Sequence, residues 1–286
     1  STWIALTDKL SVIGVSDIFI PSDYEISKTI YIATGDRDGG DNYSIGVLKS
    51  TDEGQSWKTT ALSFSVSNRY RITRMLAHPR EEGTIYVATN GGIFKTTNGG
   101  VNWPKVQDGV FFDMEFEYGG EDSVLYAVTA YSNGISPKFY KTKNAGVSWN
   151  VVQEFPNTYR IELDAAKSNP DVLYLLTSTP DGGMEGIYKS INGGESFSKI
   201  YDGTISGKNL LNWHAGDTDA GGQGWYDLTL SVSPNDENTL FLGGINSWKS
   251  TDGGENWTIV SHWYGRDGVA EVHADKHYME YQNSST

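Results

Sequence analysis

The sequence predicts an all-β protein, a β-propeller built of four-stranded antiparallel blades, and three observations carry this prediction. One octapeptide pattern, S/T-x-D/N-x-G-x-x-W/F, occurs five times in the 286 residues. Each copy follows a lysine that is preceded by an apolar or aromatic residue, so a strand is expected to lead into it. Two further strand-like runs lie upstream of each copy, and four short strands in a unit of about 46 residues match a propeller blade.

The octapeptides are expected to form the turns between the third and fourth strands of the blades. Asp or Asn can fold its side chain onto nearby backbone N–H groups, Gly supplies a positive φ, and the final aromatic packs over the turn. The carboxylates of Asp52 and Asp252 are therefore interpreted as turn residues without a catalytic role. The five copies occupy residues 50–57, 96–103, 142–149, 190–197 and 250–257.

The spacing of the repeats assigns five whole blades and a partial blade at each end. Trp3 matches the last residue of a sixth octapeptide and is expected to begin an outer strand, whereas residues 272–281 are expected to form an inner strand. We therefore expect residues 1–286 to be part of one propeller of at least seven blades in a longer chain. The alternative is a truncated or unusually closed ring. The whole blades are placed at about residues 12–60, 69–106, 110–153, 158–201 and 225–261.

Composition and charge exclude several classes of partner and site. The net charge is -14, with 22 Lys+Arg against 36 Asp+Glu, and a negative field repels nucleic-acid phosphates and anionic lipids. No apolar run approaches the roughly 20 residues of a membrane-spanning helix, so neither nucleic acid nor direct membrane insertion is expected. The chain has no cysteine, which excludes disulfides, thiolate metal sites and a cysteine nucleophile.

Two long loops are the candidate ligand-binding region. In this strand order, residues 201–225 and 261–271 connect fourth strands to the next first strands, on the face opposite the octapeptide turns. Long loops often carry function, and aromatic faces beside polar groups commonly hold sugars or peptide side chains. The alternative role of the tryptophans is to pin the long loop to the blades. The candidate residues are Trp213, His214, Trp225, Tyr226, His262, Trp263, Tyr264 and Arg266.

One candidate cation site lies on the expected inner strand near the end of the chain. His273, Asp275 and His277 alternate there, so their side chains would share one face and offer two imidazoles and a carboxylate. The alternative is a hydrogen-bonded structural cluster along the central channel.

A second candidate cation site lies in the loop of residues 34–46. Asp36, Asp38 and Asp41 surround two glycines there, and hard oxygen donors in a flexible loop suit calcium. Their spacing departs from the EF-hand pattern, and the alternative is a solvated acidic loop. No cofactor is expected beyond calcium or another divalent cation at these two places.

The octapeptides resemble the Asp-box, or BNR, repeat of sialidases, xyloglucanase-type glycoside hydrolases and sortilin-like receptors. Longer segments, at residues 34–54, 222–257 and 272–281, are similar to large secreted bacterial proteins with sortilin-type propellers, many of which carry a C-terminal type IX secretion sorting signal. The resemblance implies a secreted or cell-surface protein of the bacterial exterior, with further domains in the same polypeptide and an adhesive or polymer-associated role.

Two functions of different classes are weighed. The first is a non-catalytic binding or structural scaffold for an extracellular glycan or protein, which the resemblance and the aromatic loops favour. The alternative is a glycoside hydrolase of xyloglucanase-like type, which needs two carboxylates across a cleft. No pair is chosen by the sequence, so catalytic residues are not assigned. A sialidase is disfavoured, because Thr73 and Glu162 stand where its Arg-Ile-Pro segment needs proline. The candidate carboxylates on expected inner strands are Asp17, Asp113, Asp164 and Asp227.

Overall fold

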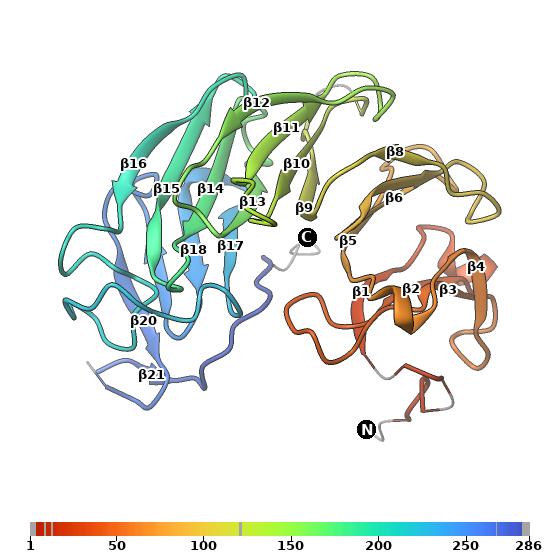
Figure 1. Ribbon diagram of the computed structural model, residues 1–286, viewed down its shortest axis with the longest axis horizontal. Helices are drawn as coiled ribbons and strands as arrows, with labels where there is room; N and C mark the ends of the chain where they lie inside the picture. The colour runs from red at the N-terminus through yellow and green to blue at the C-terminus, as the bar shows by residue number, and fades with distance from the viewer. Residues whose placement is uncertain (1–3, 9, 13, 120–121, 267, 282–286) are drawn as a thin grey trace. The chain divides into compact units, whose positions relative to one another are not determined.

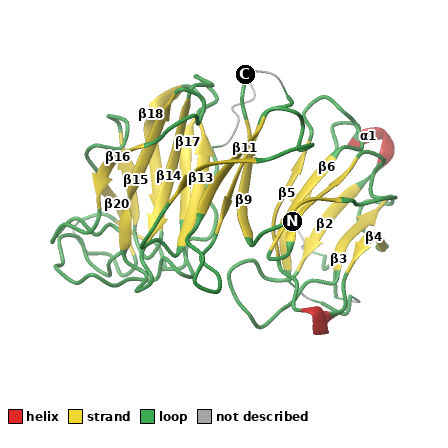
Figure 2. Cartoon of the chain, turned by 45° about the horizontal axis from the view of Figure 1, so that its top comes forward, coloured by secondary structure: helices red, strands yellow, loops and turns green. Residues whose placement is uncertain are grey.

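The computed structural model describes residues 4–281, except positions 9, 13, 120–121 and 267. These residues form five sheets of four or five strands (Figure 1). Helix is confined to two short segments, α1 (Tyr24–Ser27) and the 3-10 helix η1 (Val66–Asn68), as Figure 2 shows. The predicted all-β propeller fold with antiparallel blades is confirmed. No described helix is long and apolar enough to cross a membrane.

The chain divides into two compact units. Unit 1 consists of residues 1–114 and 146–148, and unit 2 of residues 115–145 and 149–286. Unit 1 holds two sheets, and in each the spatial order of the strands follows the sequence. The first contains β1 (Val15–Phe19), β2 (Ile30–Thr34), β3 (Gly46–Ser50) and β4 (Lys58–Ser63), and the second β5 (Ile72–Ala77), β6 (Ile85–Thr89), β7 (Gly92–Thr96) and β8 (Lys105–Gln107).

Unit 2 holds two whole sheets and most of a third, again in sequence order. The third sheet contains β9 (Phe111–Phe116), β10 (Leu125–Thr129), β11 (Lys138–Thr142) and β12 (Asn150–Glu154). The fourth contains β13 (Arg160–Ala165), β14 (Val172–Ser178), β15 (Met184–Ile191) and β16 (Ser198–Asp202). The fifth contains β17 (Thr229–Ser233), β18 (Asp236–Gly243), β19 (Ser247–Ser250), β20 (Thr258–His262) and β21 (Ala270–Glu271), the last paired parallel to β20.

The core of each unit lies between neighbouring sheets. In unit 1, Tyr31 and Val47 of the first sheet pack with Val87 of the second. In unit 2, Leu176 of the fourth sheet packs with Leu242 of the fifth. The buried strands are therefore apolar on both faces, as is typical of strands enclosed by packed sheets.

The octapeptide turns are closed by a repeated set of hydrogen bonds. Ser250 Oγ donates to Asp252 Oδ1 at 2.8 Å and accepts from the backbone N–H of Gly254 at 2.9 Å. Bonds from the backbone and side chain of Asn256 lower the pKa of Asp252 to about 2. The same pattern recurs in the turns that begin at residues 50, 96 and 190. The turn acids are thus occupied by structural bonds.

The lysine directly before each octapeptide also has a structural role. In all five sheets its ammonium lies 5.0 to 5.8 Å from the centre of an aromatic ring on the second strand. In unit 2, Lys141 Nζ donates to the carbonyl of Gly193 in the next turn at 2.6 Å. In unit 1, Tyr31 Oη donates to the carbonyl of Gly99 in the next turn at 3.2 Å. Lysine and ring therefore join adjacent sheets.

The structure differs from the sequence prediction mainly at the two ends of the chain, where strands are expected. Residues 272–281 contain no strand, although an inner strand is predicted there. Asp275 adopts a φ of 72°, which interrupts extended backbone. The segment is held instead by a backbone hydrogen bond from the N–H of Lys276 to the carbonyl of Gly244. Trp3 lies outside the described residues, and residues 4–6 are not in a strand.

Replacing Ser250 with alanine is expected to destabilise unit 2 by about 1 to 3 kcal/mol, because the buried N–H of Gly254 loses its acceptor. The midpoint of urea unfolding should fall accordingly. The exposed Glu255, in the same turn, supplies the control, since Glu255→Ala should leave the midpoint unchanged. Equal midpoints for the two variants would contradict the role given to the turn.

Candidate functional site

The two candidate loops of unit 2 meet, and a buried asparagine joins them. Asn246 Nδ2 donates to the carbonyls of Asn212 and Trp213, each at 3.1 Å, and its Oδ1 accepts from the backbone N–H of Trp263 at 3.2 Å. The indole N–H of Trp263 donates to the carbonyl of Trp213 at 3.2 Å. One side chain and one indole therefore fix the loop of residues 201–225 against that of residues 261–271.

Five rings from these loops form the aromatic cluster. The rings of Trp213 and Trp263 pack edge to face at 5.6 Å, and those of His214 and His262 stack at 5.6 Å. Tyr264 packs edge-on against Trp263 at 4.5 Å. Such contacts contribute about 0.5 to 1.5 kcal/mol each beyond the burial of area, so the cluster is a rigid surface.

The structure separates the two roles that the sequence leaves open for these rings. His262 is fully buried and Trp263 half-buried with its N–H used internally, which fits the pinning role. Trp213 and Tyr264 are each 41% exposed and present ring surface to solvent. Arg266 is exposed beside them, with Nη1 3.5 Å from Tyr264 Oη. The exposed part of the cluster can thus contact a ligand.

Trp225 and Tyr226 form a second aromatic pair at the end of the long loop. Their ring centres are 5.6 Å apart, and Trp225 is 50% exposed. The ring of Tyr226 packs edge-on against His277 at 4.6 Å.

Asp227, the residue after this pair, is the most perturbed acid in the molecule as described. It is 1% exposed, and neither carboxylate oxygen has a hydrogen-bond partner of good geometry among the described residues. Burial, with the negative charge of Asp275, raises its pKa to about 7, although nearby N–H groups and His277 oppose the rise. A carboxyl that keeps its proton near neutral pH can act as a general acid.

The other candidate carboxylates are occupied by backbone N–H groups. Asp17 Oδ2 accepts from the N–H of Met75 at 2.7 Å, within unit 1. Asp164 Oδ2 accepts from the N–H of Val232 at 2.6 Å, within unit 2. Both bonds join a first strand to the first strand of the next sheet. Asp113 accepts from the N–H of Met114 at 2.9 Å and lies 3.6 Å from Arg74. These three acids therefore have structural partners that Asp227 lacks.

The candidate cation ligands near the end of the chain are not brought together. His273 makes a local contact with the carbonyl of Ala274, whereas His277 packs on Tyr226. Without a strand, the alternation that would align them with Asp275 is lost. Across the described residues, no group of three or more His, Cys, Asp or Glu side chains is placed to hold a metal ion.

The acidic loop of unit 1 carries its own positive charges. Asp36 Oδ1 accepts from the backbone N–H of Asp38, whose carboxylate lies 3.6 Å from Arg37. Arg71 donates to the carbonyl of Gly39 in the same loop. Asp41 is exposed to solvent. Two arginines therefore contact this acidic loop, through a carboxylate and a backbone carbonyl.

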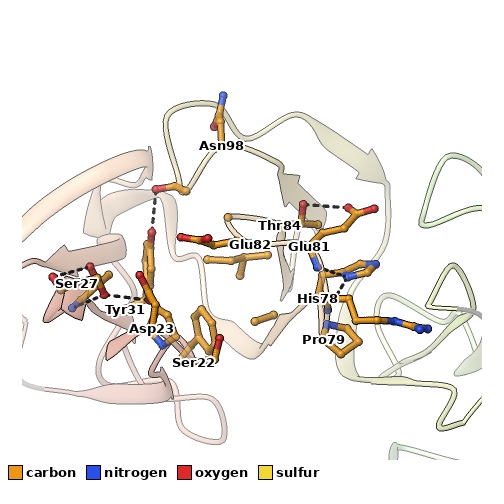
Figure 3. Close-up of a pocket in the computed structure, with 18 of the residues that line it drawn as sticks. Ser22, Asp23, Ser27, Tyr31, His78, Pro79, Glu81, Glu82, Thr84 and Asn98 are labelled. Carbon is orange, nitrogen blue, oxygen red and sulfur yellow. Dashed lines mark hydrogen bonds between the residues drawn. The ribbon is translucent and has the colours of Figure 1, made fainter. Parts of the chain in front are cut away.

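The described residues form a pocket in each of the two units. The larger, of about 690 Å³, is in unit 1 and is lined by Tyr31, Glu81 and Glu82 (Figure 3). Many of its polar groups bond to one another, as in the bonds from Thr84 to Glu81 and from Ser27 to Asp23. The smaller, of about 180 Å³, lies against the loop of residues 201–225 in unit 2. Neither pocket contains a residue proposed from the sequence.

Sequence reasoning missed the asparagines that shape the long loop. Asn209 Nδ2 donates to the carbonyls of residues 219, 220 and 221, and its Oδ1 accepts from the N–H groups of Met184 and Leu211. Asn246 has the corresponding role between the loops. An amide can bridge donors and acceptors that are distant in sequence, and such partners leave no local pattern.

The different roles of two tryptophans can be tested separately. Trp263→Ala is expected to destabilise unit 2 by about 2 kcal/mol or more, because ring packing and the bond to Trp213 are both lost. Trp213→Ala should change stability by only about 0.5 kcal/mol, since the residue is 41% exposed. Thermal unfolding measures both, and the reverse order would contradict the assignment.

The chain is similar in sequence to known xyloglucanases. No protein-family model matches the chain. The xyloglucanase Xgh74A of Acetivibrio thermocellus is 24% identical over 322 residues, covering 92% of this chain and 35% of that protein. A xyloglucanase of Hypocrea jecorina is 24% identical over 315 residues, with the same coverage. The chain spans about a third of the length of these relatives.

Solved structures agree on the fold. An ancestral GH74 enzyme superposes with a TM-score of 0.62 at 20% identity, covering 91% of this chain and 32% of that one. YCF48 bound to D1 peptide superposes with a TM-score of 0.52 at 18% identity, covering 86% of this chain and 66% of that one. The chain is therefore similar in fold to proteins with different partners, and it has the β-propeller architecture that its repeats predict.

Proposed function

We propose that the chain is part of a glycoside hydrolase acting on a β-glucan polymer of the xyloglucan class, with Asp227 as its general acid. The observation that carries this proposal is the state of Asp227, a buried carboxyl without a good hydrogen-bond partner, whose pKa is raised to about 7. Glycoside hydrolysis needs such an acid to protonate the departing oxygen.

The sequence comparisons support the hydrolase over a purely structural scaffold. The curated relatives that cover nine-tenths of this chain are xyloglucanases. Their identity of 24 to 25% leaves the substrate of this chain a proposal. The Asp-box assignment is supported by the recurring bonds in the turns, whereas the kinship with sortilin-type and type IX secreted proteins rests on sequence resemblance alone.

Asp275 is the candidate for the second carboxylate. It lies close enough for its charge to raise the pKa of Asp227, and it is exposed where Asp227 is buried. Hydrolysis requires one protonated carboxyl as the acid and a second carboxylate as nucleophile or base, and we assign the second role to Asp275. Contact between Asp227 and a glycosidic oxygen requires neighbouring residues to move, because Asp227 is 1% exposed.

The exposed aromatic rings supply a surface for the polymer. Trp213, Trp225 and Tyr264 all belong to the two loops of unit 2 and are 41 to 50% exposed. Pyranose rings stack on such faces while their hydroxyls bond to neighbouring polar groups. Because a polysaccharide cannot cross a membrane unaided, we place the protein in the exterior of the cell, secreted or surface-bound.

A second candidate is a glycan-binding propeller without catalysis. The burial of Asp227 favours this function, since a carboxyl that is 1% exposed scarcely contacts solvent, whereas the rings of Trp213, Trp225 and Tyr264 do. Incubation with xyloglucan distinguishes the two functions. Release of new reducing ends supports the hydrolase, and binding without release supports the scaffold.

Polymer binding should depend on the exposed rings in either case. The double variant Trp213→Ala, Trp225→Ala is expected to bind xyloglucan about tenfold more weakly, as the loss of two stacking contacts implies. Trp213→Phe with Trp225→Phe keeps the rings and should retain most of the affinity. Affinity electrophoresis in xyloglucan gels measures this, and unaltered mobility of the alanine variant would place the binding surface elsewhere.

A further inference from the structure

We propose that Arg160 is a positioning residue for Asp227, with Glu162 as its counter-ion. Both lie on β13 of the fourth sheet, whereas Asp227 precedes β17 of the fifth, so the arrangement joins two sheets of unit 2. The inference rests on the proposed function, in which Asp227 is the acid.

Arg160 holds the backbone on both sides of Asp227. Its Nη1 donates to the carbonyl of Tyr226 at 2.7 Å, and its Nη2 donates to the carbonyl of Leu228 at 3.3 Å. The rigid, planar guanidinium thus binds the carbonyls of the two residues that flank Asp227. Because these two bonds fix the peptide groups around residue 227, they fix the direction in which its side chain leaves the backbone.

Glu162 neutralises this arginine at short range. Its Oε1 accepts from Arg160 Nη2 at 2.7 Å and from Nε at 3.2 Å, and the two side chains are only 2% and 7% exposed. A buried cation needs such a partner, and an unbalanced one would favour the ionised form of a nearby acid. The pairing therefore lets arginine shape the backbone at Asp227 while leaving its carboxyl protonated.

The remaining charges around Asp227 come from the segment of residues 272–281. Asp275 favours the protonated form of Asp227, and His277 favours the ionised form. Lys276 lies nearby, and its Nζ donates to the carbonyl of Ile245 at 2.7 Å. Removing the Glu162 carboxylate would take away a negative charge that lies 2.7 Å from the buried guanidinium of Arg160.

A direct titration of Asp227 tests the pairing without relying on activity. In protein labelled with ¹³C at aspartate carboxyl groups, the Asp227 signal is assigned by its loss in Asp227→Asn. Glu162→Gln should lower the midpoint of that titration by about one unit of pH or more, because the substitution removes a negative charge beside Arg160 and so favours the ionised form of a nearby acid. An unchanged midpoint in folded Glu162→Gln protein would overturn the proposal whether or not the protein hydrolyses glycans.

A second variant covers the case in which Glu162→Gln fails to fold. Replacing Arg160 and Glu162 together with methionine removes both charges, a change that buried ion pairs often tolerate. The Asp227 midpoint should then stay near its original value, while kcat on xyloglucan falls at least tenfold with KM nearly unchanged. Wild-type kcat in the double variant would overturn the positioning role. Absence of hydrolysis in the wild type, with the titration shift present, would overturn only the proposed function.

Discussion

Replacing Asp227 with asparagine is expected to make the protein's stability less dependent on pH. The folded state keeps this carboxyl protonated up to a pKa of about 7, whereas the unfolded chain releases the proton near pH 4. Between these values the folded state binds more protons, so its stability falls as pH rises, by at most about 1.4 kcal/mol per pH unit. Above pH 7 both states are ionised and the dependence ends.

Urea unfolding at pH 4, 6 and 8 measures this effect. The wild type should lose a few kcal/mol from pH 4 to pH 8 relative to Asp227→Asn, which cannot ionise at this position. Asp164→Asn is the matched control, because its carboxylate accepts two backbone N–H groups and the change should weaken folding at every pH. If the free energy of unfolding changed with pH equally in the wild type and in Asp227→Asn, the protonated state assigned to Asp227 would be contradicted.

The same substitution is expected to reduce kcat on xyloglucan by about 10² to 10⁴-fold, as removal of a general acid usually does. Affinity for the polymer should change little, because the exposed rings are untouched. Asp252→Asn makes the same substitution in the same unit and should keep wild-type activity, since three other octapeptides carry asparagine at this position. Equal loss of activity in both variants would indicate a general effect of charge or folding.

The repeated parts of the fold could be predicted from the sequence because each is formed by near neighbours. Ser50, Asp52 and Gly54 bond to one another within five residues, so the octapeptide contains its own turn. The strand of residues 272–281 could not be predicted correctly, because a strand needs a partner. His273, Asp275 and His277 do alternate in the sequence, but the segment pairs with no strand among the described residues, and Asp275 bends the backbone.

The site could be predicted only in part, for a related reason. The convergence of the two long loops follows from strand order, and the loops do meet through Asn246. Asp164 and Asp227 are distinguished by residues distant in sequence. The N–H of Val232 donates to Asp164, whereas burial and the charge of Asp275 raise the pKa of Asp227. Similarly, Arg71 lies far along the chain from the acidic loop that it helps to hold. Charge balance of this kind is a property of the folded chain.

The most direct test of the central claim is the pH dependence of kcat on xyloglucan between pH 4 and pH 9. If Asp227 is the general acid, the wild-type rate should fall above a midpoint near pH 7, where this carboxyl loses its proton. That alkaline limb should be absent from the residual activity of Asp227→Asn. A wild-type rate that stays constant from pH 6 to pH 9, or tight binding without any hydrolysis, would contradict the account.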